Sequence, residues 1–152
     1  MNLRLKETYE VQFDQIDGTW IWRIIVSESA LIEFTMAFCL IFSKLISQIE
    51  IISKTSTNRI QLSKFSDDQH TPISWVDFSD RDANLLLSHV ETKAIMFFCL
   101  KAVRDGKTEV DHIDIEASPR KHGKLGGTLI VKFPNSIESM RPIDVRRNLG
   151  LR

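Results

Sequence analysis

The stretch that decides the fold comprises residues 27–48, SESALIEFTMAFCLIFSKLISQ. Apolar side chains recur here at spacings of three and four residues, the period of an α-helix: Ala30, Leu31, Phe34, Phe38, Ile41, Leu45 and Ile49. The Ser27 hydroxyl suits an N-cap, so the pattern predicts a helix that begins there. Because the polar stripe of this helix is thin, we expect the rest of the chain to cover it on most sides.

This helix is predicted to belong to a protein core and not to a membrane. Its uncharged window extends only from residue 34 to residue 43, whereas a bilayer span needs about 20 apolar residues. The N-terminal residues carry no hydrophobic signal region, and both cysteines, Cys39 and Cys99, lie inside apolar runs. We therefore expect a cytoplasmic protein with buried, reduced thiols.

The remaining patterns predict an α+β fold. Alternating and β-branched segments predict about six strands, at residues 8–14, 19–26, 48–54, 59–65, 108–117 and 128–133. Asp17-Gly18 is a strong hairpin signal between the first two of these strands. The expected order is ββαββαββ, with an antiparallel sheet and two apolar helices packed on one of its faces. Residues 1–133 form the expected single domain, and 134–152 a basic C-terminal tail.

The sequence leaves two interpretations open for the second helix. Ser79 is expected to cap it, directly after the short apolar segment 75–78. Residues 94–103 fit either the continuation of this helix or a central strand. A low content of β-branched residues favours one long helix, which would end near Asp105-Gly106.

Two short similarities raise the question of an internal duplication. Phe38-Cys39-Leu40 recurs as Phe98-Cys99-Leu100, and the surroundings of Trp22 resemble those of Trp75. A duplicated strand–helix module explains both similarities, and so does chance, because the two similarities do not share one period.

The charge is distributed unevenly along a chain with no net charge. Residues 1–117 hold 12 Lys and Arg against 18 Asp and Glu, whereas residues 118–152 hold 8 against 2. Six acidic residues are the candidate partner-binding face: Asp77, Asp80, Glu109, Asp111, Asp114 and Glu116. An acidic surface attracts basic partners. The leading hypothesis is therefore a non-catalytic protein-binding module. Its most specific version is an inhibitor or immunity-type protein that neutralises a basic, nuclease-like partner.

The basic end supplies an alternative function. Cations in the loop and tail would bind nucleic acid through its phosphates, and the candidates are Arg120, Lys121, Lys124, Arg146 and Arg147. The glycines of the loop lack the spacing of a nucleotide-binding P-loop.

No motif reaches the specificity of an enzyme active site, so we expect no catalysis, cofactor or metal. His112, Asp114 and Glu116 share one face of a predicted strand, where they would hold a divalent metal or simply face solvent. There is no Gly-x-Ser-x-Gly elbow, and buried cysteines are poor nucleophiles.

Overall fold

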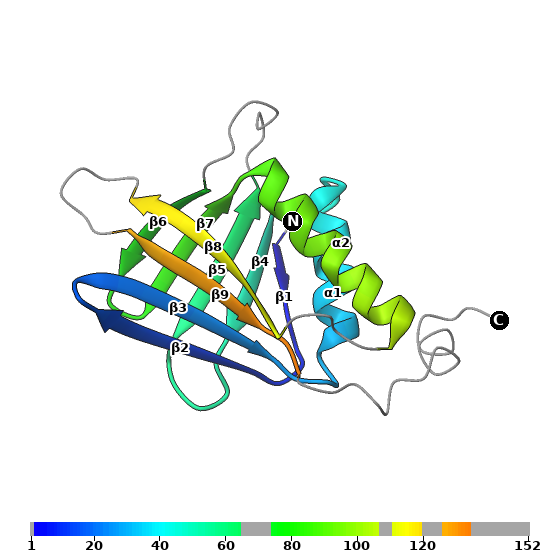
Figure 1. Ribbon diagram of the computed structural model, residues 1–152, viewed down its shortest axis with the longest axis horizontal. Coiled ribbons are helices and arrows are strands. Elements are labelled where there is room, and N and C mark those ends of the chain that lie inside the picture. Colours follow the sequence, from blue (N-terminus) through cyan, green and yellow to red (C-terminus); the bar gives the residue numbers. More distant parts are fainter. Residues whose placement is uncertain (1, 65–73, 107–110, 120–125, 135–152) are drawn as a thin grey trace.

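The computed structural model describes residues 2–64, 74–106, 111–119 and 126–134. Two helices and nine strands follow one another in this part of the chain (Figure 1). Their bounds are β1 (Asn2–Arg4), β2 (Tyr9–Ile16), β3 (Thr19–Val26), α1 (Leu31–Phe42), β4 (Gln48–Ile52), β5 (Arg59–Lys64), β6 (Ser74–Ser79), β7 (Asp82–Leu87), α2 (His89–Asp105), β8 (His112–Pro119) and β9 (Gly127–Lys132).

The α+β class is confirmed, but the prediction of about six antiparallel strands is wrong. The nine described strands form one mixed sheet in the order β1-β4-β5-β7-β6-β8-β9-β3-β2. Strands that follow one another in hairpins pair antiparallel, whereas β1–β4, β3–β9, β5–β7 and β6–β8 pair parallel. Sequence alternation sets the face of each residue in a strand but not the neighbouring strand, so the parallel junctions had no local signal.

The sheet curls until its outer strand β2 approaches the end of β4. The amide of Lys54, just beyond β4, donates to the carbonyl of Tyr9 in β2 at 3.0 Å. The Asn58 side chain reaches the carbonyl of Val11 at 3.0 Å, and the Val11 amide reaches the Ser53 hydroxyl at 3.3 Å. These bonds satisfy part of the backbone that an open edge would leave unpaired.

The chain contains the same architectural unit twice. The first unit is β2-β3-α1-β4-β5, and the second is β6-β7-α2-β8-β9. Strand registers match between the units: Ile24 pairs with Val11 and Val131, and Leu85 pairs with Val76 and Leu62. The pairs Ile51–Ile60 and Ile115–Leu129 correspond in the same way. Only β1 has no counterpart among the described strands.

Equivalent residues of the two units meet at the border of the core, where both are partly buried. Phe13 of β2 pairs with Trp22, and Phe78 of β6 pairs with Ala83, so the two phenylalanines are counterparts. Their rings contact each other edge to face, with centroids 5.3 Å apart. Trp20 and Trp22 also pack on Phe78, and Trp22 is fully buried. Because one unit supplies each ring of the central pair, the units bury their apolar faces against each other.

The structural correspondence differs from the similarity visible in the sequence. The buried positions of β3 and α1 match those of β7 and α2 at an offset of 61 residues. Trp22 therefore corresponds to Ala83 and not to Trp75, and Phe38 corresponds to Cys99 and not to Phe98. The fold is duplicated, but the two short similarities in sequence do not lie at equivalent positions of the two units.

The first predicted helix has the right location and the wrong ends. Ala30, not Ser27, is the N-cap of α1, and the Ser27 hydroxyl donates instead to the carbonyl of Thr8. The helix ends at Phe42 rather than near Gln48, because Lys44 adopts a left-handed conformation with φ of 63°. Residues from Gln48 onward are then free to form β4.

The prediction that Ser79 caps the second helix is also wrong. Asp80 has φ of 49° and lies in a tight turn, after which residues 82–87 form β7. The true N-cap is Ser88, whose side chain accepts a hydrogen bond from the Glu91 amide at 3.2 Å. The prediction of one long helix through residues 94–103 is confirmed, and Gly106 ends this helix in a left-handed conformation.

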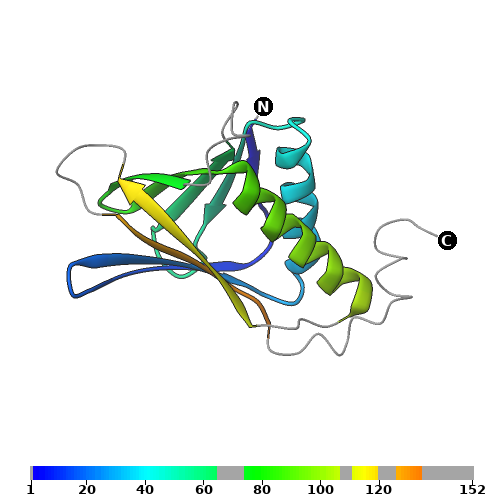
Figure 2. The same cartoon turned by 45° about the horizontal axis from the view of Figure 1, so that its top comes forward.

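The two helices pack against each other on the same side of the curved sheet, as Figures 1 and 2 show. Phe42 at the end of α1 stacks on His89 at the start of α2, with ring centroids 5.0 Å apart. The helices are therefore antiparallel neighbours. Neither described helix has the length and apolarity that a membrane crossing requires.

Candidate functional site

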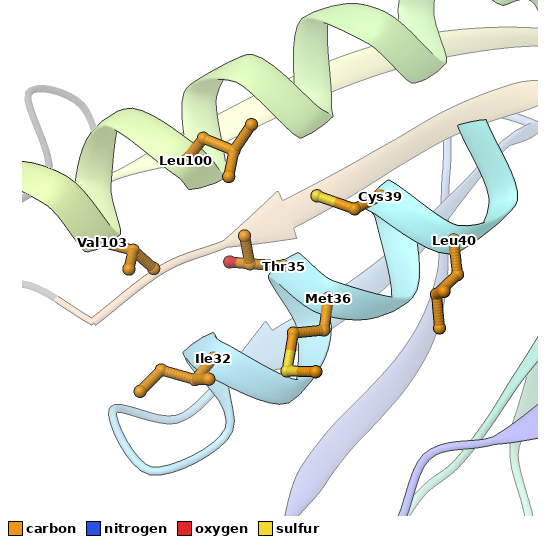
Figure 3. A pocket seen from close by; sticks show the side chains of 7 residues that line it. All are labelled: Ile32, Thr35, Met36, Cys39, Leu40, Leu100 and Val103. Atoms are coloured by element: carbon orange, nitrogen blue, oxygen red, sulfur yellow. The ribbon is translucent and has the colours of Figure 1, made fainter. Parts of the chain in front are cut away.

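An apolar groove separates the outer sides of the two helices. Its volume is about 260 Å³, and seven side chains line it: Ile32, Thr35, Met36, Cys39, Leu40, Leu100 and Val103. Figure 3 shows Leu100 and Val103 of α2 across the groove from Thr35 and Cys39 of α1. Thr35 adds almost no polarity, because its hydroxyl donates to the carbonyl of Leu31 at 2.7 Å.

A second hollow of about 490 Å³ adjoins the groove on the other side of α1, where Leu3 and the carboxylates of Glu7 and Glu33 join its lining. The amides of Lys6 and Glu7 and the hydroxyl of Tyr9 all donate to the Glu33 carboxylate at 3.0–3.1 Å. Glu33 therefore fixes the N-terminal segment onto α1, which gives this end of the site an acidic border.

The sequence predicted that α1 is covered on most sides, and this prediction is confirmed, with the outer row of α1 as the side that is left open. Met36 is 51% exposed, and Leu40 and Ile32 are only partly buried. On α2, Phe97 is 54% exposed and Leu100 is 40% exposed. Together these five side chains form what we call the helix-pair face.

The duplicated fold supplies an internal reference for this face. At the offset of 61 residues, buried positions of α1 correspond to buried positions of α2 along most of their common length. The outermost row of α1 corresponds to that of α2. Ile32 is equivalent to Lys93, Met36 to Phe97, and Leu40 to Lys101. The same structural positions are apolar on one helix and mostly cationic on the other.

The cations of α2 border the apolar side chains rather than interrupt them. The Lys93 ammonium lies 5.6 Å from the centroid of the Phe97 ring, where the ring attracts a cation. Near the other end of α2, the Arg104 guanidinium bonds to the Asp105 carboxylate at 2.8 Å. The helix-pair face thus has an acidic border at the start of α1 and basic side chains along α2.

The two thiols are not activated for chemistry. Burial raises the pKa of the Cys99 thiol to about 12, and burial also raises the pKa of Cys39, which lines the groove. A thiol acts as a nucleophile in its deprotonated form, so these shifts oppose nucleophilic catalysis.

The structure does not gather the predicted acidic residues into one cluster. Asp114 and Glu116 are exposed on the outer side of β8, and Asp111 precedes this strand. Asp77 lies in β6 and Asp80 in the turn after it. Since Val76 is level with Pro119, about nine strand residues separate Asp111 from the level of Asp77, a distance of roughly 30 Å. Glu109 lies outside the described residues.

His112 lies within reach of two carboxylates. Its Nδ1 lies 2.6 Å from Asp111 and its Nε2 lies 3.6 Å from Asp114. The hydrogen bond from His112 lowers the pKa of Asp111. Within the described ranges, no three His, Cys, Asp or Glu side chains are grouped to share a metal ion.

The candidate nucleic-acid contacts are Arg120, Lys121, Lys124, Arg146 and Arg147, and all five lie outside the described residues. That hypothesis therefore stays a prediction.

Comparison with known proteins gives no family: the chain matches no protein-family model and no curated protein. The helix-pair face was missed at the level of sequence because apolar residues at helical spacing indicate burial in most proteins. Met36 is distinguished from a core residue by its equivalence to Phe97, an exposed residue of α2. This equivalence becomes visible only once the strands of the two units are aligned.

Proposed function

We propose that this chain is a non-catalytic protein-binding module that holds its partner on the helix-pair face. The observation that carries the proposal is the contrast between the outer rows of the helices. Ile32 and Leu40 occupy positions where the equivalent residues of α2 are Lys93 and Lys101. Since this architecture accommodates lysine at such positions, packing alone does not require apolar residues there. Exposed apolar surface that the fold does not need is typical of an interaction site.

The dimensions of the groove favour a protein partner. Its volume of about 260 Å³ lies below the roughly 300–1,000 Å³ of pockets that enclose a whole small ligand, although the adjoining hollow of about 490 Å³ lies within that range. A groove between two helices instead accepts a few apolar side chains from an amphipathic helix. The border of Glu7 and Glu33 favours a partner helix with Lys or Arg along the edge that meets the start of α1.

The test transfers the outer row of α2 onto α1 in the triple variant Ile32→Lys, Met36→Phe, Leu40→Lys. The matched control is Ile16→Lys, because Ile16 is 53% exposed but lies on β2. In affinity capture from the native host lysate, we expect one protein to be retained by the wild type and by the control, and lost by the triple variant. Equal retention by all three proteins would contradict the proposal.

A basic partner bound at the acidic residues is a second candidate, in the form of an inhibitor or immunity-type protein. The observation that favours it is the exposure of Asp114 and Glu116 on the same side of β8. Neutralising Asp111, Asp114 and Glu116 would then weaken capture of that partner at low salt, while the triple variant of α1 would not.

A further inference from the structure

We infer that the partner of the helix-pair face is a second copy of this chain, and that two copies associate through α1 and α2 as a symmetric dimer. This inference rests on the proposed function and names its partner. Each copy presents what the other requires: an amphipathic helix with apolar side chains and a basic edge.

The charges of the face are complementary to themselves under a two-fold rotation. Ile32 near the start of α1 and Val103 near the end of α2 line the same groove, so the acidic border lies close to the basic end of α2. A two-fold axis along the groove places α1 of one copy against α2 of the other. Lys101 of each copy then faces Glu7 and Glu33 of the other, so opposite charges meet on both sides of the axis, at the end of the groove where α1 begins and α2 ends.

The apolar side chains would meet in the centre of the same arrangement. Met36 and Leu40 of one copy lie against Phe97 and Leu100 of the other, and all four are partly or largely exposed in the single chain. Exposed methionine and phenylalanine adapt well to such contacts, and aromatic residues and methionine are enriched in protein interfaces. The chain also has no net charge, so overall repulsion does not oppose self-association.

The size of the face sets the expected strength of the dimer. The longer helix has 17 residues, so the helix pair is about 25 Å long, and two helices side by side are about 20 Å wide. The face therefore covers roughly 500 Å² per copy, near the lower limit for a specific interface. Small interfaces are typical of weak and transient association, so we expect a reversible dimer that dissociates on dilution to roughly micromolar concentration.

Sedimentation equilibrium of the full chain, from about 1 µM to about 1 mM, tests the inference across the affinity expected for such a small interface. We expect the mass of the wild type to rise from that of one chain to that of two. Met36→Glu should weaken the dimer at least tenfold, whereas Ile16→Glu, at an equally exposed position on β2, should change the dissociation constant less than twofold.

A charge exchange tests the predicted orientation. Lys101→Glu should weaken the dimer, and the double variant Glu7→Lys, Lys101→Glu should restore it, because the two charges exchange places across the axis. Circular dichroism of each variant verifies that the helices are retained. Restoration would not follow from general loss of stability.

The outcomes separate this inference from the proposed function. A wild type that remains monomeric at every concentration overturns the dimer, and so do equal effects of Met36→Glu and Ile16→Glu. If the monomeric chain still captures another protein and loses it with the triple variant of α1, the proposed function stands and only the second copy is excluded. If neither association depends on the helix-pair face, both proposals fail.

Discussion

The two units of this protein share a fold and differ in their surfaces. Both place a hairpin, a helix and a second hairpin in matching register, with apolar residues at equivalent buried positions. The outer row of α2 carries Lys93 and Lys101, where that of α1 carries Ile32 and Leu40. The comparison teaches that packing constrains the buried rows, whereas the exposed row is open to adaptation for binding.

The largest expected effects test whether the two cores are equivalent. Ile24 and Leu85 are counterparts in β3 and β7, and both are almost completely buried. We expect Ile24→Ala and Leu85→Ala each to lower the free energy of unfolding by about 2–5 kcal/mol, because each leaves a cavity. Urea denaturation followed by circular dichroism measures both values. A small loss at one site and a large loss at the other would break the correspondence.

An intermediate effect is expected where the cores differ. Tyr9 in β2 corresponds to Ser74 in β6, whose buried hydroxyl donates to the Glu91 carboxylate at 2.7 Å and accepts from the Ser88 amide at 3.0 Å. We expect Ser74→Ala to lower the free energy of unfolding by about 1–3 kcal/mol, because it leaves both partners without this bond. Denaturation at neutral pH measures the loss.

The pH dependence of stability provides the control for that effect. Burial raises the pKa of Glu91 in the folded chain; the hydrogen bond from Ser74 lowers this pKa by less, and Glu116 raises it further. A raised pKa means that the folded chain binds the proton of Glu91 more tightly than the unfolded chain does. The contribution of this proton to the free energy of unfolding is complete below the unfolded pKa, and it declines to zero as pH rises through the folded pKa. Glu91→Gln should remove this decline. A decline of equal slope in Glu91→Gln would show that another group is responsible.

The smallest effect is expected on the outer side of β8. Asp111→Asn, Asp114→Asn and Glu116→Gln together should change the free energy of unfolding by less than about 0.5 kcal/mol, because these side chains are exposed and hold no buried group in place. Thermal or urea unfolding checks this expectation. A large loss would mean that the acidic residues serve the fold, which would weaken any interpretation of them as a binding face.

How much the sequence predicts depends on whether the signal is local. Asp17-Gly18 predicts its hairpin correctly, because both residues take the positive φ that such a turn needs. Residues 82–87 were misassigned because Ala83, Leu86 and Leu87 fit a helical period as well as a strand, and the turn at Asp80 contains no glycine. β1 has only three residues and gives no pattern.

The candidate site was less predictable than the fold. Met36 and Leu40 look like core residues in a helix as apolar as α1, and nothing in the sequence marks which side of the helix stays uncovered. The acidic residues look like one face when they are counted along the chain, but the parallel pairing of β6 with β8 places Asp77 and Asp111 far apart. Both errors come from contacts between segments distant in sequence.

The central claim is that the outer row of α1 serves binding and not packing. The most direct test is urea denaturation of the triple variant Ile32→Lys, Met36→Phe, Leu40→Lys at a protein concentration too low for self-association. We predict a free energy of unfolding within about 1 kcal/mol of the wild type, because the equivalent row of α2 folds with these residues. Loss of the cooperative unfolding transition in the variant would show instead that the fold requires the apolar row, and would contradict the claim.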